Sequence, residues 1–166
     1  AGRGRMNRLV RRVALACGLL TFALDQLSKL VMLGPLGRSL IDTVELPFFN
    51  FVLMLNRGIS FGLFNRESEL GPWLFLAISL AISTALVFWL RHIDRALPAA
   101  AIGLVVGGAL GNALDRLRLG GVVDFLDFHA MGYHWPAFNL GDSGIVIGVG
   151  FLLFDGAVVR RPSTVG

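Results

Sequence analysis

Four long apolar stretches, separated by polar segments, dominate the hydrophobic pattern of this 166-residue chain. A helix needs about 20 residues to cross a hydrocarbon core of about 30 Å, and each stretch comes close to that length. The stretches cover residues 13–33, 72–90, 97–114 and 138–159. The pattern predicts an all-α membrane protein with four transmembrane helices, folded as a single domain of residues 1–166.

The segment between the first two spans, residues 34–71, has a different pattern. Phe48–Leu55 and Ile59–Phe64 are rich in β-branched and aromatic residues, which favour strands. Between them, Asn56-Arg57-Gly58 offers a turn in which left-handed backbone is tolerated. We therefore expect a small β-hairpin or sheet on the membrane surface.

The segment between spans three and four, residues 115–137, mixes aromatic residues with histidines. This mixture is typical of a segment lying in the headgroup layer, although simple interfacial anchoring would also account for the aromatics. The residues are Phe125, Phe128, Tyr133, Trp135, Phe138, His129 and His134. We expect this segment to lie on the surface, where it could help to cover a site at the edge of the bilayer.

Composition agrees with a membrane protein, because 55% of the residues are hydrophobic and only 16% are charged. Basic residues precede the first span, lie in the link between spans two and three, and follow the last span. Positively charged segments of this kind resist translocation across the membrane. They are Arg3, Arg5, Arg8, Arg11, Arg12, Arg91, Arg95, Arg160 and Arg161. We expect both termini in the cytoplasm and the longer segments outside. The net charge of +4 is thus a topology signal, and a nucleic-acid partner is not expected.

The basic start and the apolar run Val13–Leu24 resemble a secretory signal peptide, but no small-x-small cleavage site follows. We interpret this stretch as an uncleaved anchor. The single cysteine, Cys17, lies in it, which excludes an intramolecular disulfide or a thiolate metal cluster.

Two carboxylates are the strongest candidates for chemistry. Asp124 lies just beyond the third span and Asp142 just inside the fourth, where acids are costly and usually functional. If these spans pack together, the two acids can meet, share one proton and activate water against an amide bond, as in an aspartic protease. Asp127, three residues from Asp124 on a surface segment, is expected to be solvated.

Other polar and small residues have plainer explanations. Asp25 and Lys29 lie four apart on one helix face and can neutralise one another, which favours a structural role. Small-xxx-small spacing in spans three and four predicts close helix packing. The glycines concerned are Gly103, Gly107, Gly108, Gly111, Gly144 and Gly148.

Other chemistries have less support. His129 and His134 could join an acid at a metal, but no His-Glu-x-x-His motif exists, and we expect neither a metal nor another cofactor. Ser143 adjoins Asp142 without a motif that supplies a base. An ion-coupled transporter using intramembrane acids is the main alternative, yet Asp124 and Asp142 lie at one membrane face instead of along a path. A scaffold would leave the polar motifs without purpose.

Four sequence blocks, in order, carry a resemblance to a known family. They are Asp25-Gln26-Leu27-Ser28-Lys29; Asn56-Arg57-Gly58-Ile59-Ser60-Phe61-Gly62; Gly111-Asn112-Ala113-Leu114-Asp115-Arg116 running on to Val122-Val123-Asp124-Phe125; and Phe138-Asn139-Leu140-Gly141-Asp142-Ser143. With these blocks the chain resembles the lipoprotein signal peptidases, or signal peptidase II. The family more often has alanine where this chain has Gly141.

The resemblance implies a multi-pass aspartic peptidase of the bacterial inner membrane, surrounded by lipid, with its active site near the extracytoplasmic face. A monomer is the simplest assumption for a site enclosed by one helix bundle. Its implied substrate is a diacylglyceryl-modified prolipoprotein, cut on the amino side of the lipidated cysteine. Asp124 and Asp142 match the catalytic pair. Residues that match substrate-facing or dyad-orienting positions are Asn56, Gly58, Asn112, Arg116 and Asn139, and Asp25 and Lys29 belong to a matched block. Arg116 could hold a substrate carbonyl or could instead pair with Asp115.

Overall fold

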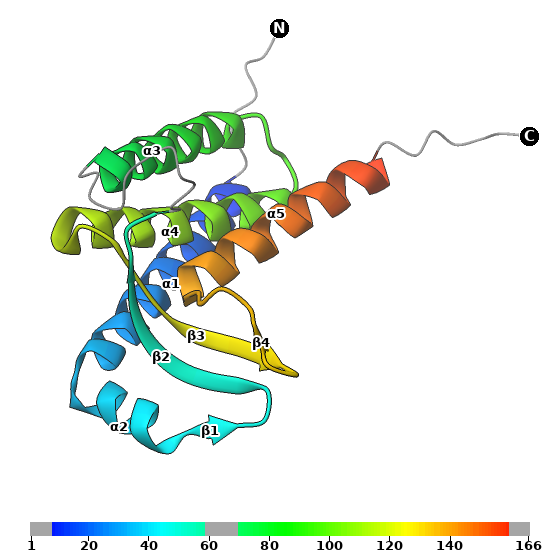
Figure 1. Cartoon of the computed structure of the whole chain (residues 1–166). Coiled ribbons are helices and arrows are strands. Elements are labelled where there is room, and N and C mark those ends of the chain that lie inside the picture. Colours follow the sequence, from blue (N-terminus) through cyan, green and yellow to red (C-terminus); the bar gives the residue numbers. More distant parts are fainter. Residues whose placement is uncertain (1–7, 59–69, 160–166) are drawn as a thin grey trace, which may run out of the picture.

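Four long helices form the body of the computed structural model, which describes residues 8–58 and 70–159. They are α1 (Arg8–Leu33), α3 (Leu70–Leu90), α4 (Ala96–Leu119) and α5 (Leu140–Val159), shown in Figure 1. In the described residues, each of the four is long and apolar enough to cross a membrane, which confirms the four predicted spans. The limits differ, because α1 already begins at Arg8 and α4 continues past residue 114 to Leu119.

Helix α4 lies at the centre and packs against α1, α3 and α5. Two-thirds of its apolar window (67%) is buried inside the protein, against 22% or less for the other three helices, whose apolar surfaces are left for lipid. Small residues allow this packing. A Cβ on Gly107 would overlap the backbone of Gly18 in α1, and one on Gly108 would overlap Gly141 in α5. The glycines thus set the close approach that their spacing predicts.

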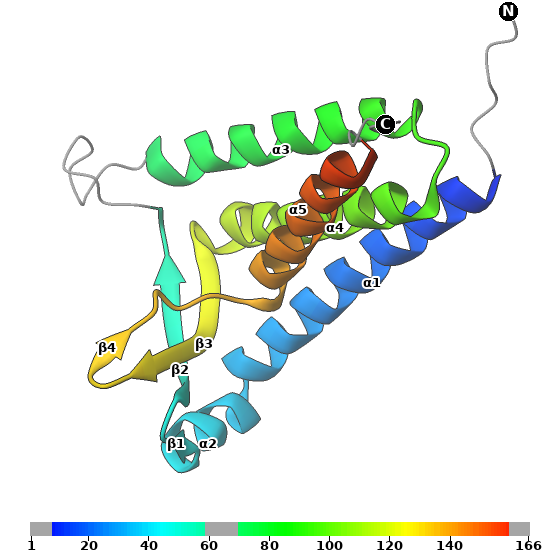
Figure 2. The ribbon, with the colours of Figure 1, turned by 90° about the vertical axis from the view of Figure 1, so that its right-hand side faces the viewer.

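A small antiparallel sheet lies at one end of the helices, as Figure 2 shows. Its described strands follow the order β1-β2-β3-β4. Their bounds are β1 (Glu45–Leu46), β2 (Phe49–Asn56), β3 (Val122–Ala130) and β4 (Tyr133–His134), and a short helix α2 (Pro35–Thr43) precedes β1. The chain enters α1 and leaves α5 at the end away from the sheet (Figure 2).

The pairing of β2 with β3 joins two segments that are far apart in sequence. A small sheet is confirmed, but the residues 59–64 expected to pair with β2 lie outside the described part of the chain. The segment 115–137, expected simply to lie on the surface, instead continues α4 and then forms β3 and β4. β3 is anchored by Val123 and Phe125, which pack with Met32 at the end of α1 in a buried cluster.

The transition from α4 to β3 depends on Gly120. Its φ of +70° places it in the left-handed region, and its N–H donates to Arg116 O at 3.1 Å, a common way to end a helix. β3 begins two residues later, so Asp124 lies close to the end of α4.

Candidate active site

Asp124 and Asp142 are held by a common residue, Asn139. Asp124 lies on β3 and is buried, while Asp142 lies in the first turn of α5 and is partly buried. The Asn139 side chain donates from Nδ2 to Asp124 Oδ1 at 2.8 Å, and its backbone N–H donates to Asp142 Oδ2 at 3.2 Å. The structure therefore brings the two predicted acids into one site, as the sequence predicts.

Asn139 is fixed in this position by the start of α5. It is completely buried, and its Oδ1 accepts the backbone N–H of Asp142 at 2.9 Å. An asparagine just before a helix commonly satisfies a free N–H of the first turn in this way. With Oδ1 occupied, Nδ2 must face Asp124. A carboxylate in that first turn also gains from the positive end of the helix dipole.

Asn112, on α4, supports the other acid. Its Nδ2 donates to Asp142 Oδ1 at 2.7 Å. Its Oδ1 accepts hydrogen bonds from Lys29 Nζ at 2.9 Å and from Asn139 Nδ2 at 3.2 Å. The cation of Lys29 thus fixes which end of the Asn112 amide faces Asp142.

Asn56, at the end of β2, reaches Asp124, and Gly58 holds the Asn56 amide in place. Asn56 Nδ2 donates to Asp124 Oδ2 at 2.9 Å, and Asn56 Oδ1 accepts the Gly58 N–H at 2.9 Å. Gly58 has a φ of +111°, and a Cβ there would come within 2.5 Å of the Phe75 ring on α3. Glycine is therefore required both by backbone conformation and by space.

Burial raises the pKa of Asp124 above its usual range, because a charged carboxylate is poorly solvated there. The amide donors Asn56 and Asn139 offset part of this effect by stabilising the ionised form. The nearby negative charge of Asp142 raises the pKa further, and Lys29 lowers it slightly. Asp124 therefore ionises at a higher pH than an exposed aspartate does.

A buried ionic cluster lies behind these asparagines. Lys29 Nζ is 2.8 Å from Asp25 Oδ2 and 2.7 Å from Asp115 Oδ2, and all three side chains are almost completely buried. Gln26 Nε2 donates to both carboxylates at 3.1 Å. Asp25 and Lys29 therefore form the predicted ion pair, and Asp115 shares the same cation.

The same cluster fixes the two elements that carry the acids. Asp25 Oδ1 accepts the Gly141 N–H at the start of α5 at 2.8 Å, and Asp115 Oδ2 accepts the Val123 N–H at the start of β3 at 3.2 Å. Sequence reasoning considered Asp115 only as a partner of Arg116 and gave Gln26 no role. Their membership of the matched blocks was the available signal.

Arg116 extends from the last turn of α4 beside the two acids. Its Nη1 donates to Asn112 O at 3.2 Å, and its charge interacts with Asp142 and Asp124. Among the described residues, Asp115 forms its ion pair with Lys29 and acts on Arg116 only through its charge. Arg116 Nε is buried without a hydrogen-bond partner in the described structure.

The predicted exposure of the Asp127 side chain is wrong. It was expected to be solvated, yet it is buried, and His134 Nδ1 lies 2.8 and 3.0 Å from its two oxygens. The turn after β3 folds β4 back, which covers Asp127, and His134 stacks on His129 with centroids 5.0 Å apart.

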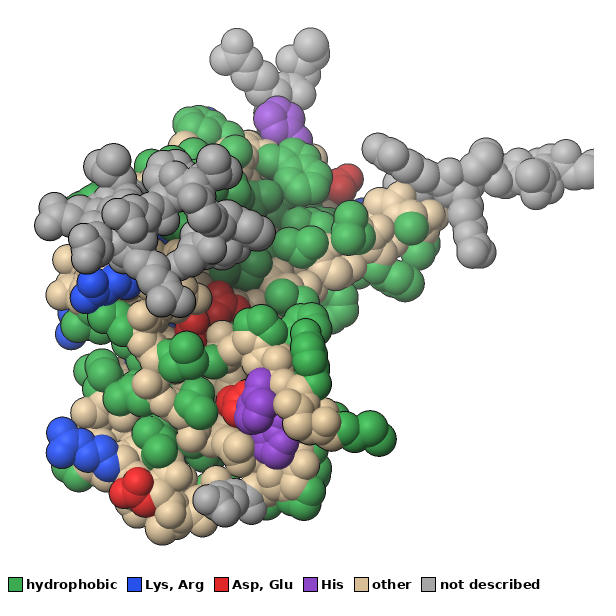
Figure 3. All heavy atoms as spheres, in the orientation of Figure 1, with side chains coloured by type: hydrophobic (Ala, Val, Ile, Leu, Met, Phe, Trp, Pro, Cys, Tyr) green, Lys and Arg blue, Asp and Glu red, His purple; other side chains and the backbone are tan. Residues whose placement is uncertain are grey.

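On the face drawn in Figure 3, acidic side chains lie between the helices and the sheet, and histidines gather lower on the sheet. Within the described ranges, no three His, Cys, Asp or Glu side chains are arranged to hold a metal.

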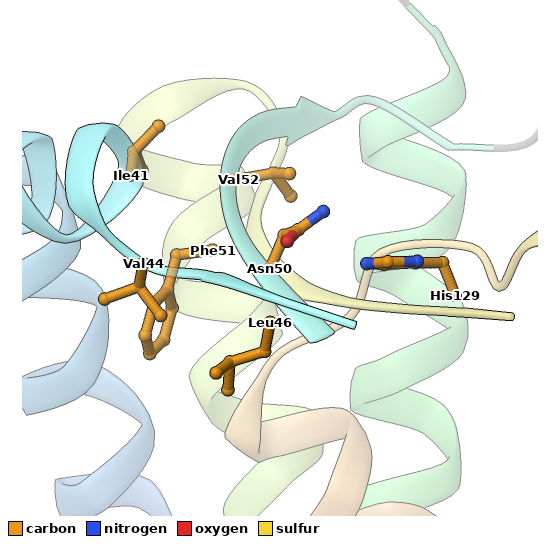
Figure 4. Close-up of a pocket in the computed structure, with 7 residues that line it drawn as sticks. All are labelled: Ile41, Val44, Leu46, Asn50, Phe51, Val52 and His129. Carbon is orange, nitrogen blue, oxygen red and sulfur yellow. The ribbon is translucent and has the colours of Figure 1, made fainter. Parts of the chain in front are cut away.

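A separate cavity of about 340 Å³ lies between the α2–β1 connection and the sheet. Figure 4 shows the His129 imidazole directed toward Asn50, and the apolar side chains of Ile41, Val44 and Leu46 also line the cavity. Neither acid of the pair lines this cavity. The candidate active site is therefore the amide-lined cluster around Asp124 and Asp142.

The chain is similar to one known family and to individual members of it. Residues 17–158 match the family described as Signal peptidase (SPase) II. A lipoprotein signal peptidase from Methylorubrum extorquens is 46% identical over 158 residues, which are 92% of this chain and 91% of that relative. One from Alteromonas mediterranea is 42% identical over 140 residues, 82% of this chain and 75% of the relative.

Solved structures agree with the sequence relatives. A bacterial membrane enzyme solved by the in meso method at 1.9 Å resolution has a TM-score of 0.77 and 26% identity, over 98% of this chain and all of that one. A second, solved at 2.3 Å, has a TM-score of 0.72 and 28% identity, with 92% and 94% of the two chains covered. The arrangement of helices and sheet is thus shared with membrane enzymes.

Proposed function

This chain belongs to the signal peptidase II family of lipoprotein signal peptidases, and from that premise we propose that it is an aspartic endopeptidase with Asp124 and Asp142 as its catalytic pair. Its substrate is a diacylglyceryl-modified prolipoprotein, cut on the amino side of the lipidated cysteine. The observation that carries the proposal is the hydrogen bonding of both carboxylates to the buried Asn139. Two acids from different elements are thereby held in one amide-lined site.

Catalysis follows from two carboxylates that share one proton. The ionised carboxylate removes a proton from water as its oxygen attacks the scissile carbonyl carbon, and the protonated carboxyl donates to the carbonyl oxygen. The resulting tetrahedral diol collapses when the carboxyl that took the water proton gives it to the nitrogen, the C–N bond breaks, and one diol hydroxyl returns its proton to the other carboxylate. No bond forms between enzyme and substrate, and the pair ends with one proton, as it began.

The remaining site residues orient this pair and the substrate. The amides of Asn56, Asn112 and Asn139 donate to the carboxylates without bringing further charge into the site. Arg116 Nε has no hydrogen-bond partner in the described part of the chain, and such a donor beside the acids suits a backbone carbonyl of the substrate. Asp25 and Lys29 act one step further back, through Asn112 and Gly141.

The site operates at the extracytoplasmic face of the bacterial inner membrane. The four spans support a multi-pass protein, and Arg91 and Arg95 mark the α3–α4 link as cytoplasmic. Both termini are then cytoplasmic, and the sheet with Asp124 lies outside. One copy of the chain supplies both acids and all their amide donors, so the protein acts as a monomer within the surrounding lipid.

Cleavage of a purified diacylglyceryl-prolipoprotein by the wild-type protein and single variants tests the proposal. Asp124→Asn and Asp142→Asn are each expected to abolish cleavage, because one carboxylate alone cannot supply both base and acid. Asp127→Asn is the matched control, since it makes the same change on the same strand. Ser143→Ala, whose hydroxyl bonds only to Asn139 O in the described structure, excludes a serine nucleophile if cleavage persists.

Two results would overturn this function. Robust cleavage by either catalytic-pair variant rejects the two-acid mechanism, and loss of cleavage on addition of a chelator rejects a metal-independent one. Absence of cleavage by folded wild type, with product followed by mass spectrometry, rejects the substrate class.

A further inference from the structure

Few hydrogen bonds orient the Arg116 guanidinium in the described structure. A guanidinium carries five N–H donors, and the described structure uses one of them, from Nη1 to Asn112 O at 3.2 Å. Nε is buried without a partner. In the described structure, the other interactions that hold the guanidinium are its charge attraction to Asp142, Asp124 and Asp115 and its contact with an aromatic ring.

Phe75, on the second turn of α3, supplies that contact. Arg116 Cζ lies 5.5 Å from the centroid of the Phe75 ring, within the range of a cation–π interaction. The same ring packs against Gly58, where an added Cβ would lie 2.5 Å from a ring carbon. Phe75 thus contacts both Arg116 and the turn that aims Asn56 at Asp124.

We propose that Phe75 is a positioning residue that holds the Arg116 guanidinium and the Asn56–Gly58 turn in place for the substrate. This inference rests on the proposed peptidase function. A substrate carbonyl beside Arg116 would give the buried Nε the partner that it lacks, and leaving such a donor unpaired is costly. The aromatic face keeps the donors directed at that position while excluding water. The benefit is therefore expected mainly in substrate binding.

Helix α3 also offers a matched control. Arg91 Cζ lies 4.6 Å from the ring centroid of Phe88, so the far end of the same helix carries a second arginine–phenylalanine pair. Phe88→Leu and Phe75→Leu make the same chemical change in the same helix and each removes one cation–π contact. They differ in that Phe88 is exposed and remote from the acids, whereas Phe75 contacts Arg116 and Gly58.

Kinetics with the lipidated substrate test the inference. For Phe75→Leu we expect kcat/KM to fall roughly five- to thirtyfold, mostly through KM, which is the size expected for loss of a partly buried cation–π contact. Phe88→Leu is expected to stay within about twofold of wild type. Phe75→Tyr, which keeps the aromatic face, should recover most of the loss. In an Arg116→Lys background, Phe75→Leu should cost less than in wild type, because the planar guanidinium that the ring holds is gone, and the loss that remains reports on the Asn56–Gly58 turn.

Equal kinetics for Phe75→Leu and Phe88→Leu, or full additivity with Arg116→Lys, would overturn the inference. Thermal unfolding in detergent checks that each variant is folded, and Phe75→Met, a flexible apolar replacement, takes the place of Phe75→Leu if leucine prevents folding. Failure of the peptidase proposal has a different signature, since wild type would then not cleave or Asp124→Asn would remain active.

Discussion

Each Asp124 oxygen accepts one amide N–H, so the ionisation of this residue depends on individual donors. Burial raises the pKa of Asp124, and the Asn56 donor lowers it in part. We therefore expect Asn56→Ala to raise this pKa further. If ionised Asp124 is the catalytic base, the acid limb of the rate profile should lie above the ordinary aspartate value of about 3.9 in wild type and move to still higher pH in the variant. Initial rates measured across pH check this.

Asn50→Ala is the control for that experiment, because Asn50 also lies on β2 but pairs in register with Asp127. An unchanged or lowered acid limb in Asn56→Ala contradicts the assigned role. The pH dependence of stability gives an independent test of the direction of the Asp124 pKa shift. The folded protein binds the Asp124 proton more tightly than the unfolded chain does, so this contribution to the free energy of unfolding is fully present below about pH 3.9 and is lost as pH rises through the folded pKa.

The sequence identifies the site residues better than it predicts their contacts. Asn112 and Asn139 were found from the matched blocks, but nothing in their spacing tells which amide end faces which acid. Lys29, 83 positions from Asn112, decides that orientation. The prediction that Asp127 is solvated is wrong for a related reason, since its burial depends on β4 folding back over β3.

At the scale of elements, one buried lysine holds α1, α4, β3 and α5 together through Asp25 and Asp115. Lys29→Met would leave two buried carboxylates without their cation. We expect the free energy of unfolding to fall by about 3–5 kcal/mol, the usual cost of breaking a buried ion pair. Unfolding in detergent with increasing denaturant measures the change, and cleavage should fall with it because Asn112 loses its orienting donor.

Arg95→Ala is the matched comparison for Lys29→Met. Arg95 also bridges two helices, through Asp155 of α5 at 2.7 Å, but its side chain is 48% exposed. An exposed pair contributes about 0–1 kcal/mol, so little change is expected. If both variants lose the same stability, the buried cluster has no special role in joining the elements.

The approach of α4 to α5 gives a second prediction at this scale. A Cβ at Gly108 would overlap Gly141, next to Asp142, so Gly108→Ala should separate the helices and lower both stability and kcat. Overpacking of this kind costs about 1–3 kcal/mol. Gly150→Ala, on α5 with nothing within 4 Å of its added Cβ, should be neutral or stabilising through helix propensity. Equal effects in thermal unfolding would reject packing as the reason for Gly108.

For the whole molecule, the hydrophobic pattern predicted the four helices because lipid imposes a length and an apolar composition on each span. The sheet was only partly predictable. Strand propensity identified β2, but its partner β3 comes from a segment beyond two helices, and such long-range pairing leaves no local signal. The dyad could be anticipated from two acids near span ends, whereas the Asp25–Lys29–Asp115 cluster that fixes them required the folded structure.

The basic residues predict the orientation of the whole molecule in the membrane, and this prediction has a direct test. The α3–α4 link carries Arg91 and Arg95, which predicts that it stays in the cytoplasm, while the turn between β3 and β4 lies on the opposite side with Asp124. Met131, at that turn, is fully exposed, and His92 in the link is exposed too. In a Cys17→Ser background, Met131→Cys should react with a membrane-impermeant maleimide in intact spheroplasts. His92→Cys should react only after lysis.

Labelling of these two cysteines also tests on which side of the membrane the proposed catalytic pair lies. β3 runs continuously from Asp124 to Ala130, so labelling of residue 131 from outside would put the catalytic pair at the extracytoplasmic face, where a signal peptide emerges after translocation. The reverse labelling pattern would invert the chain and place the acids on the side that the substrate leaves. Cleavage of translocated prolipoprotein would then be impossible, so the orientation and the proposed function depend on each other.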